Sequence, residues 1–395
     1  MAVTLAVACQ AIAATASAQV TVASELQGAA YPHEALGRSA DASDLRGWAS
    51  VDYDGHLRED VVVRGDVVVY AAGHGRPLVD GEATLAWRGK RLEVAGGLLR
   101  ERWGRFTNSE LDTLGPMNTL FSLVEPELRL SQPAVRTTLF FEGVSLDAYA
   151  LIGRRAQPVP GIERRFGFGV PSRDIAQRGR LGDQAIAVRV SGTRPALDWG
   201  AHVFSGLNRR ATFVPRFGPD AQLAAIDGIS TEILQVGGEV DTTVRDWRFL
   251  AEGFSRFGAL NVIGQEQTYA HVATAAEYQR LGAFDGSYDV VPRFEVTVDT
   301  RGDRADLPFG SSIRAGMRIA TTQLLPVQVE GAYSYDWALR GHGVIASVEK
   351  RLAESPTMTL GFRFTKFSAG DKPSVLDIWK RDLELSSFVR IELSR

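Results

Sequence analysis

The sequence predicts an all-β fold, namely a transmembrane antiparallel up-and-down β-barrel of about 18 strands with short periplasmic turns and long outer loops. Three observations predict it. Apolar and polar side chains alternate in runs of about ten residues, long connections alternate with short ones, and after residue 18 no run of roughly 18 apolar residues occurs. Because only helices and closed barrels satisfy every backbone polar group in lipid, such a chain crosses a bilayer only as a closed barrel.

The first 18 residues are expected to be a signal peptide. They are rich in Ala, Val and Leu, contain Cys9, and end in Ala16-Ser17-Ala18, the small-x-small pattern of a secretory cleavage site. A buried N-terminal helix is the alternative. After cleavage, residues 19–395 form a single barrel domain without cysteine, which suits an oxidising compartment.

The alternation of side chains is clearest between residues 61 and 71. The odd positions carry Val, Gly and Ala, whereas the even positions include Arg64, Asp66 and Tyr70. The same alternation recurs in 293–299, 313–320, 327–337 and 358–364. Strands of soluble sandwiches are usually about five or six residues long, so these longer runs favour tilted strands that cross a membrane.

Eighteen strands follow from this pattern. They are predicted at 19–26, 46–54, 60–71, 82–88, 91–100, 134–142, 144–152, 183–191, 197–205, 231–243, 246–256, 267–280, 287–299, 309–321, 327–338, 343–352, 357–367 and 383–394. The long connections are 27–45, 101–133, 153–182, 206–230 and 368–382. An even strand number places both termini on the turn side. Sixteen strands is the alternative, because 19–26 and 287–299 show the weakest alternation.

One stretch resembles a known family. It comprises Gly96-Gly97-Leu98-Leu99-Arg100-Glu101-Arg102-Trp103-Gly104, then Gly115-Pro116-Met117-Asn118, Pro126-Glu127-Leu128-Arg129 and Pro133, and later Pro158-Val159-Pro160. Together with the strand rhythm, residues 90–172 resemble the large outer-membrane porin-like β-barrel proteins of proteobacteria. The resemblance implies an 18-stranded or similar barrel that conducts or imports small organic solutes.

Composition and motifs argue against other classes of function. The net charge of −3 does not favour a nucleic-acid partner. The six histidines show no metal-ligand spacing, and neither a G-x-S-x-G elbow nor a dinucleotide fingerprint occurs. We therefore expect no cofactor, no metal and no enzymatic activity. A barrel enzyme with His202, His33 or His74 at one rim is the alternative.

Charged residues on the presumed inner face are the candidates for lining a pore. We expect residues 101–133 to fold into the lumen as a constriction, because this long connection contains a polar helix start at 107–109 followed by acidic residues. The pore-lining or constriction candidates are Arg64, Asp66, Glu110, Asp112, Arg248, Glu252, Arg293, Glu295, Arg314, Arg318, Glu330 and Arg363. Mixed signs across a pore orient polar solutes, although salt bridges that stiffen the wall would use the same residues.

The connection 153–182 is strongly basic. It carries Arg154, Arg155, Arg164, Arg165, Arg173, Arg178 and Arg180. Three interpretations are open: the cluster attracts anions to a channel mouth, it contacts lipopolysaccharide phosphates, or it is a solvated face without a specific role.

The leading functional hypothesis is a passive or facilitated channel for small organic solutes in a bacterial outer membrane, reached by export through the periplasm. The alternative is a barrel with a closed lumen that serves as a structural or surface-interaction protein. Either protein contacts outer-membrane lipid and lipopolysaccharide, and both a monomer and a trimer are compatible with the sequence.

Overall fold

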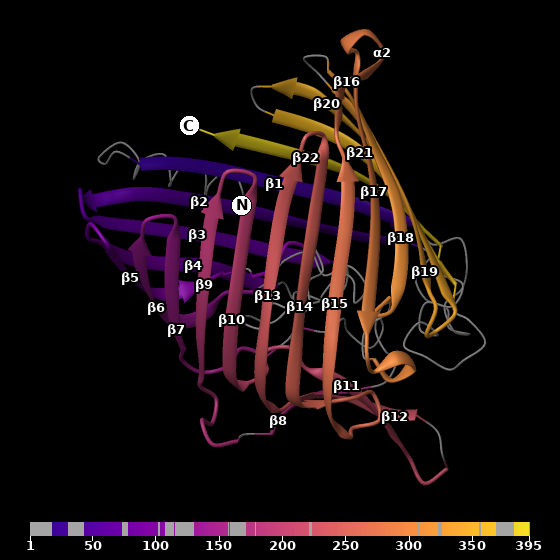
Figure 1. The fold of residues 1–395 in the computed structure, drawn as a ribbon. Coiled ribbons are helices and arrows are strands. Elements are labelled where there is room, and N and C mark those ends of the chain that lie inside the picture. The colour runs from indigo at the N-terminus through magenta and orange to yellow at the C-terminus, as the bar shows by residue number, and fades with distance from the viewer. Residues whose placement is uncertain are drawn as a thin grey trace.

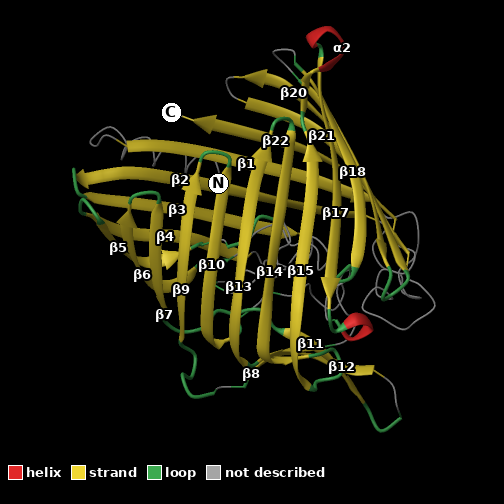
Figure 2. Ribbon diagram, in the orientation of Figure 1, coloured by secondary structure: helices red, strands yellow, loops and turns green. Residues whose placement is uncertain are grey.

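The computed structural model describes residues 18–30, 43–72, 78–101, 103–106, 114, 130–156, 158, 171–177, 179–220, 223–305, 309–322, 326–354, 357–368 and 383–394. Strands dominate these residues, and helical turns are confined to α2 (Ala283–Gly286) and a short 3₁₀ turn at Gly302–Arg304 (Figure 2). Among the described residues, no helix is long and apolar enough to span a membrane.

Eighteen antiparallel strands form the main sheet. They are β1 (Ala18–Ala30), β2 (Ser43–Arg58), β3 (Val61–Ala72), β4 (Leu78–Arg88), β5 (Leu92–Leu99), β6 (Gln132–Phe141), β7 (Val144–Leu151), β9 (Ala185–Arg194), β10 (Leu197–Leu207), β13 (Glu232–Val244), β14 (Trp247–Leu260), β15 (Glu266–Tyr278), β17 (Tyr288–Asp299), β18 (Ser312–Thr321), β19 (Val327–Asp336), β20 (Gly341–Glu354), β21 (Thr357–Ser368) and β22 (Leu383–Ser394). The short β16 (Arg280–Gly282) prolongs β15 and also pairs with β17.

The sheet closes on itself. Each strand pairs with its neighbour along the chain, and β22 pairs with β1 over ten residue pairs from Thr21–Ser394 to Ala30–Leu385. In Figure 1, β9, β10 and β13–β15 cross the direction of β1–β4 at a steep angle, as opposite walls of a barrel with tilted strands do. The predicted barrel and its strand number of eighteen are confirmed. The alternative of sixteen is wrong, because β1 and β17 are both paired strands.

The two ends of the barrel differ. Short connections such as 59–60, 142–143 and 195–196 lie at one end, which we call the turn end, and the long connections lie at the other, the loop end. Figure 1 shows α2 beyond the turn end and strands β8, β11 and β12 at the loop end. This arrangement is the one expected from the alternating connection lengths.

The loop end contains a second sheet that the sequence did not predict. β8 (Ser172–Ala176) runs parallel to β12 (Leu223–Ser230), which pairs antiparallel with β11 (Thr212–Phe217). We expected the connections 153–182 and 206–230 to be loops, and this part of the prediction is wrong. These strands are five to eight residues long and pair only with each other, so they lack the long alternation that marked the barrel strands.

The outer wall is apolar. Val67, Val236 and Phe249 are among many large hydrophobic side chains that remain more than a third exposed. Beside the short turn 245–246, the ring of Trp247 stacks on Phe249 with centroids 6.1 Å apart and lies 5.0 Å from the ring of Tyr278. An apolar band with aromatic residues near its edge is typical of a wall that faces lipid.

Candidate permeation pathway

The inner wall carries the charged residues. On β3, Val62, Val68 and Tyr70 are buried whereas Val67 is 47% exposed, so the even positions of this strand face inward. The predicted charges on strands all lie opposite exposed apolar residues of their own strands, and therefore point inward: Arg64, Asp66, Arg248, Glu252, Arg293, Glu295, Arg314, Arg318, Glu330 and Arg363. Glu110 and Asp112 lie outside the described residues.

The chain that follows β5 enters the interior. Trp103 is only 1% exposed, and its ring centroid lies 5.7 Å from that of Tyr149 on β7 and 4.7 Å from that of His202 on β10. Both partners are on the inward faces of their strands, because Tyr149 and His202 are buried while their chain neighbours Ala150 and Val203 are exposed. Trp103 therefore packs against the inner wall.

The next residues of this chain reach β14. The backbone N–H groups of Arg105 and Phe106 donate to Glu252 Oε2 on β14, at 2.7 and 3.4 Å. The ring of Phe106 packs with Leu250, which is also on β14, and lies 5.6 Å from the guanidinium carbon of Arg293 on β17. Five strands separate β5 from β14 along the wall, so the segment lies inside the barrel and runs along the inner wall past these strands.

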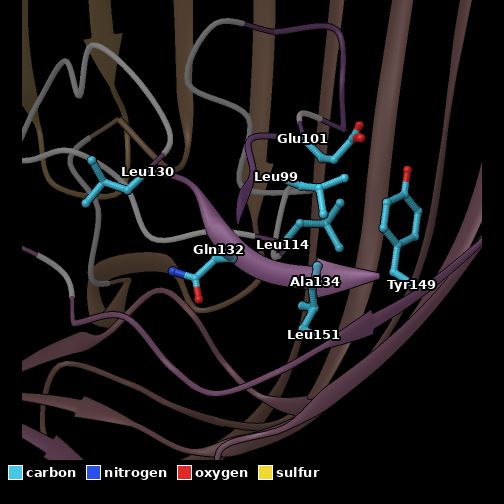
Figure 3. A pocket seen from close by; sticks show the side chains of 8 residues that line it. All are labelled: Leu99, Glu101, Leu114, Leu130, Gln132, Ala134, Tyr149 and Leu151. Atoms are coloured by element: carbon cyan, nitrogen blue, oxygen red, sulfur yellow. The ribbon is translucent and has the colours of Figure 1, made fainter. Parts of the chain in front are cut away.

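Later residues of the same connection pack against β5–β7 and leave only a small cavity. Leu114 and Leu130 lie with Leu99, Ala134 and Leu151 around a cavity of about 10 Å³ (Figure 3). A volume of this size holds at most one water molecule. Among the described residues, Leu114 and Leu130 therefore pack closely against the inner side of β5–β7.

A polar network fills the neighbouring wall. His202 Nε2 lies 3.0 Å from Gln235 Nε2, and Gln235 Oε1 accepts from Nε and Nη2 of Arg256 at 2.8 and 2.6 Å. Arg256 Nη1 donates to the Tyr269 hydroxyl at 2.7 Å. All four side chains are buried, on β10, β13, β14 and β15. His202 is the member of this network that contacts the ring of Trp103.

Open space remains beside the strands that precede β5. A hollow of about 340 Å³ lies beside β1–β4, lined by Gln19, Thr21, Asp52, Tyr53, Asp54, Arg64, Gly65, Asp66, Glu82 and Arg100. Three carboxylates stand in one cross-strand row, with Asp52 opposite Asp66 and Asp66 opposite Glu82. Like charges directly opposite each other destabilise a sheet, so this row is kept at a cost in stability.

Arg100 forms an ion pair with the middle carboxylate of this row, Asp66, and with the neighbouring Asp80. Its Nη1 donates to Asp66 at 2.6 Å and its Nη2 to Asp80 at 2.7 Å. Burial lowers the pKa of Arg100, but the bond to Asp80 and the charge of Asp66 outweigh burial and raise the pKa above its ordinary value. Within the described part of the chain, Asp52 and Glu82 have no arginine or lysine at ion-pair distance, and Asp52 accepts only from Ser50 Oγ at 3.4 Å.

Arginines without a carboxylate partner in the described structure occur on β18 and β21, which are separated by β19 and β20. Arg314 and Arg318 lie opposite Glu295 and Glu330 in register. Among the described residues, however, no carboxylate lies within ion-pair distance of Arg314, Arg318 or Arg363. The interior thus has carboxylates on β2–β4 and unpaired arginines on β18 and β21, an arrangement that produces a transverse field.

Other predicted pore residues are held in ion pairs along the wall. Arg248 binds Asp241 through Nε at 3.0 Å and through Nη2 at 2.6 Å. Arg293 Nε lies 2.5 Å from Glu295. Arg64 pairs with Asp54 at 3.2 Å, with both side chains about half exposed. These ion pairs are compatible with both predicted roles, stiffening of the barrel wall and lining of a pore.

The described arginines of the basic connection have defined partners in several cases. Arg154 forms two bonds with Asp174 on β8, and Arg155 binds Asp80 together with the carbonyl of Val79 at 2.8 Å. The backbone N–H of Arg180 donates to Glu232 at 2.6 Å, and Arg173 is an exposed residue of β8. Arg164, Arg165 and Arg178 lie outside the described residues.

Several residues of this interior were missed by the sequence analysis. Asp80, whose side chain is fully buried, was overlooked because its strand was predicted to begin at 82 and begins at Leu78. Trp103 lies in the stretch that carries the family resemblance, and that resemblance was the only indication in the sequence that this residue matters. Gln235 and Arg256 were not singled out, although both occupy the inward parity of predicted strands.

The fold has clear counterparts among solved structures. OccAB1 of Acinetobacter baumannii aligns with a TM-score of 0.59 and 12% identity over 96% of this chain and 97% of its own. OccK2 (OpdF) of Pseudomonas aeruginosa gives 0.58 and 11% over 95% and 98%, and OpdL of the same species 0.56 and 10% over 96% and 99%. The chain has the fold of the Occ/Opd outer-membrane porins. No protein-family model and no curated protein matches it.

At these low identities the porin fold is what the structures share. The resemblance drawn from residues 90–172 is confirmed at the level of fold. The porin fold supplies a closed wall of eighteen strands, and this chain's own side chains determine which part of the interior is open.

Proposed function

We propose that this chain is a porin-like channel through which small organic solutes cross the bacterial outer membrane, passively or by facilitated passage. The observation that carries the proposal is the charged hollow of about 340 Å³ beside β1–β4, inside a closed barrel with the porin fold. A lumen lined by ionisable side chains suits water and polar solutes. This is a role in transport rather than in catalysis.

We further propose that residues 101–133 form the constriction of this channel. Support comes from the contacts of Trp103 with His202 and of Arg105 and Phe106 with Glu252, which hold the segment inside the barrel. Solutes then pass on the side of β1–β4, between the carboxylates and the arginines of β18 and β21. Glu110 and Asp112 remain candidates for the same constriction.

The location follows from the same reasoning. A closed barrel with an apolar outer face belongs in an outer membrane, after export directed by residues 1–18 and passage through the periplasm. Residues 1–17 lie outside the described residues, and Ala18 is the first residue of β1. Outer-membrane lipid and lipopolysaccharide are the proposed surroundings, and a monomer and a trimer both stay open.

A closed-lumen barrel with a structural or surface-interaction role is the second candidate. One observation favours it: the apolar packing around Leu114 leaves only about 10 Å³ next to β5–β7. The two candidates differ in whether the space beside β1–β4 continues through the barrel.

Planar-bilayer recording distinguishes the two functions. Purified protein is refolded in detergent, its folding is checked by heat-modifiable gel mobility, and it is added to a bilayer with salt on both sides. Discrete single-channel steps, together with swelling of proteoliposomes in isotonic amino acids or sugars, are expected of the channel. A folded barrel that gives no steps overturns the channel and supports the closed barrel.

A further inference from the structure

The connection between β10 and β11 contains a buried arginine with few partners. Arg209 is 1% exposed, and Asn208, Arg210 and Ala211 around it in the chain are also buried. Its Nη2 donates to the backbone carbonyl of Asp183 at 2.9 Å. Nε and Nη1 have no hydrogen-bond partner, and among the described residues no carboxylate forms an ion pair with this guanidinium.

A second arginine lies nearby. Arg154, which follows β7, donates to Asp174 Oδ2 at 2.6 Å and to Ser230 Oγ at 3.2 Å, while its Nε has no partner. Burial and then the charge of Arg154 lower the pKa of Arg209 to about 10, and the charge of Asp183 opposes them. Because this value is well above neutral pH, Arg209 carries its charge. Among the described residues, Arg154 has a carboxylate at ion-pair distance, that of Asp174, whereas the carboxylate of Asp183 acts on Arg209 only from beyond that distance.

A buried cation without a counter-charge is costly. Buried charges in folded proteins are paired with an opposite charge or coordinate an ion, since desolvation of an isolated charge costs several kcal/mol. Water satisfies unpartnered N–H groups but supplies no charge. Among the described residues, Arg209 therefore lacks a carboxylate at ion-pair distance as well as acceptors for Nε and Nη1.

We propose that Arg209 and Arg154 bind a small inorganic anion beneath the loop-end sheet of β8, β11 and β12. The side chain of Arg209 is too enclosed for an organic solute or a lipid headgroup, so the ligand is an ion of the size of chloride or phosphate. The ion joins two connections, since Arg154 follows β7 and Arg209 follows β10, and Arg209 is itself bonded to the backbone of Asp183, which precedes β9. It thereby holds the small sheet against the barrel rim.

Thermal unfolding of the detergent-solubilised barrel tests this site without requiring channel activity. Wild-type protein is unfolded in sodium gluconate, whose anion is too large, and then with chloride or phosphate replacing gluconate at constant ionic strength. The unfolding temperature is expected to rise and saturate with one of the small anions. In Arg209→Gln, the apparent affinity for that anion falls by more than about tenfold, because a charge-assisted contact is lost.

Arg216→Gln is the matched control. Arg216 lies on β11 of the same small sheet, but it is largely exposed and pairs with Asp227 at 3.4 Å. This variant keeps the wild-type response to the anion. In gluconate alone, Arg209→Gln is at least as stable as the wild type, since it lacks the uncompensated charge.

If Arg209→Gln does not fold, hydrogen exchange of the wild-type protein tests the site instead. In the wild type, the anion slows amide exchange at 207–211 and 153–156 and leaves 216–220 unchanged. Equal unfolding temperatures in all three salts, or an unaltered response in Arg209→Gln, overturn the proposal. A response that appears only on addition of lipopolysaccharide also overturns it, because the arginines then bind a lipid headgroup.

Discussion

The backbone N–H of Arg105 donates to Oε2 of Glu252 at 2.7 Å, although the two residues are 147 positions apart in the chain. This bond joins the segment after β5 to β14, and it converts a long connection into part of the interior. Glu252 was predicted to line a pore, and in the structure its carboxylate accepts hydrogen bonds from the segment that enters the lumen after β5. The first prediction concerns this anchor.

Glu252→Ala is expected to loosen the segment that enters the lumen after β5. The buried N–H groups of Arg105 and Phe106 lose their acceptor, which costs about 1–3 kcal/mol of unfolding free energy. Single-channel recordings should show a larger mean conductance with more frequent fluctuations. Glu330→Gln is the control, because Glu330 is an exposed inward carboxylate without contact to the described residues of the segment. A similar change in that variant would refute the anchoring role.

Trp103→Ala is expected to open space against His202 and Tyr149. Removing a buried tryptophan costs about 3–5 kcal/mol, measurable as a lower midpoint in urea unfolding. The conductance should rise, because the segment loses the contacts of Trp103 with Tyr149 and His202 on the inner wall. Trp247→Ala removes a tryptophan from the outer wall, where it is 46% exposed, and should leave conductance unchanged. Unaltered conductance in folded Trp103→Ala would show that Trp103 does not narrow the passage.

The carboxylate row beside the hollow predicts the ion preference of the channel. Asp52→Asn combined with Glu82→Gln should move the reversal potential in a potassium chloride gradient toward anions, since two negative charges leave the passage. Relief of repulsion with Asp66 should also make this variant slightly more stable, by about 0.2–1 kcal/mol. Arg314→Gln should shift the potential in the opposite direction. If the reversal potential is the same in the wild type and in both variants, the ions pass elsewhere.

Arg100→Ala is expected to be the most destabilising of the charge substitutions. It leaves Asp66 and the fully buried Asp80 without this partner, and removing one member of a buried ion pair costs about 3–5 kcal/mol. The measurement is urea unfolding followed by heat-modifiable mobility. Arg100→Lys should recover part of the loss, because the charge stays while only one of the two contacts is replaced. Equal stability of the wild type and Arg100→Ala would mean that Arg155 alone compensates Asp80.

The sequence by itself determined the barrel. On β3, the alternation of Val67 with Asp66 and Val68 showed which face turns to lipid, because side chains of a strand alternate with a period of two. The strand number followed from the same alternation and from the connection lengths, since a wall in lipid must pair all its backbone groups and close. These are local properties, visible wherever ten residues of one strand are read together.

Only the tertiary structure decided where the interior is open. Trp103 meets His202, and Arg105 meets Glu252, because a long connection folds back through the lumen, and no local pattern encodes such a distant contact. The sheet of β8, β11 and β12 was missed because short strands that pair only with each other show little alternation. Arg209 illustrates the same limit: its isolation among buried groups depends on how three connections pack together, so it becomes visible only in three dimensions.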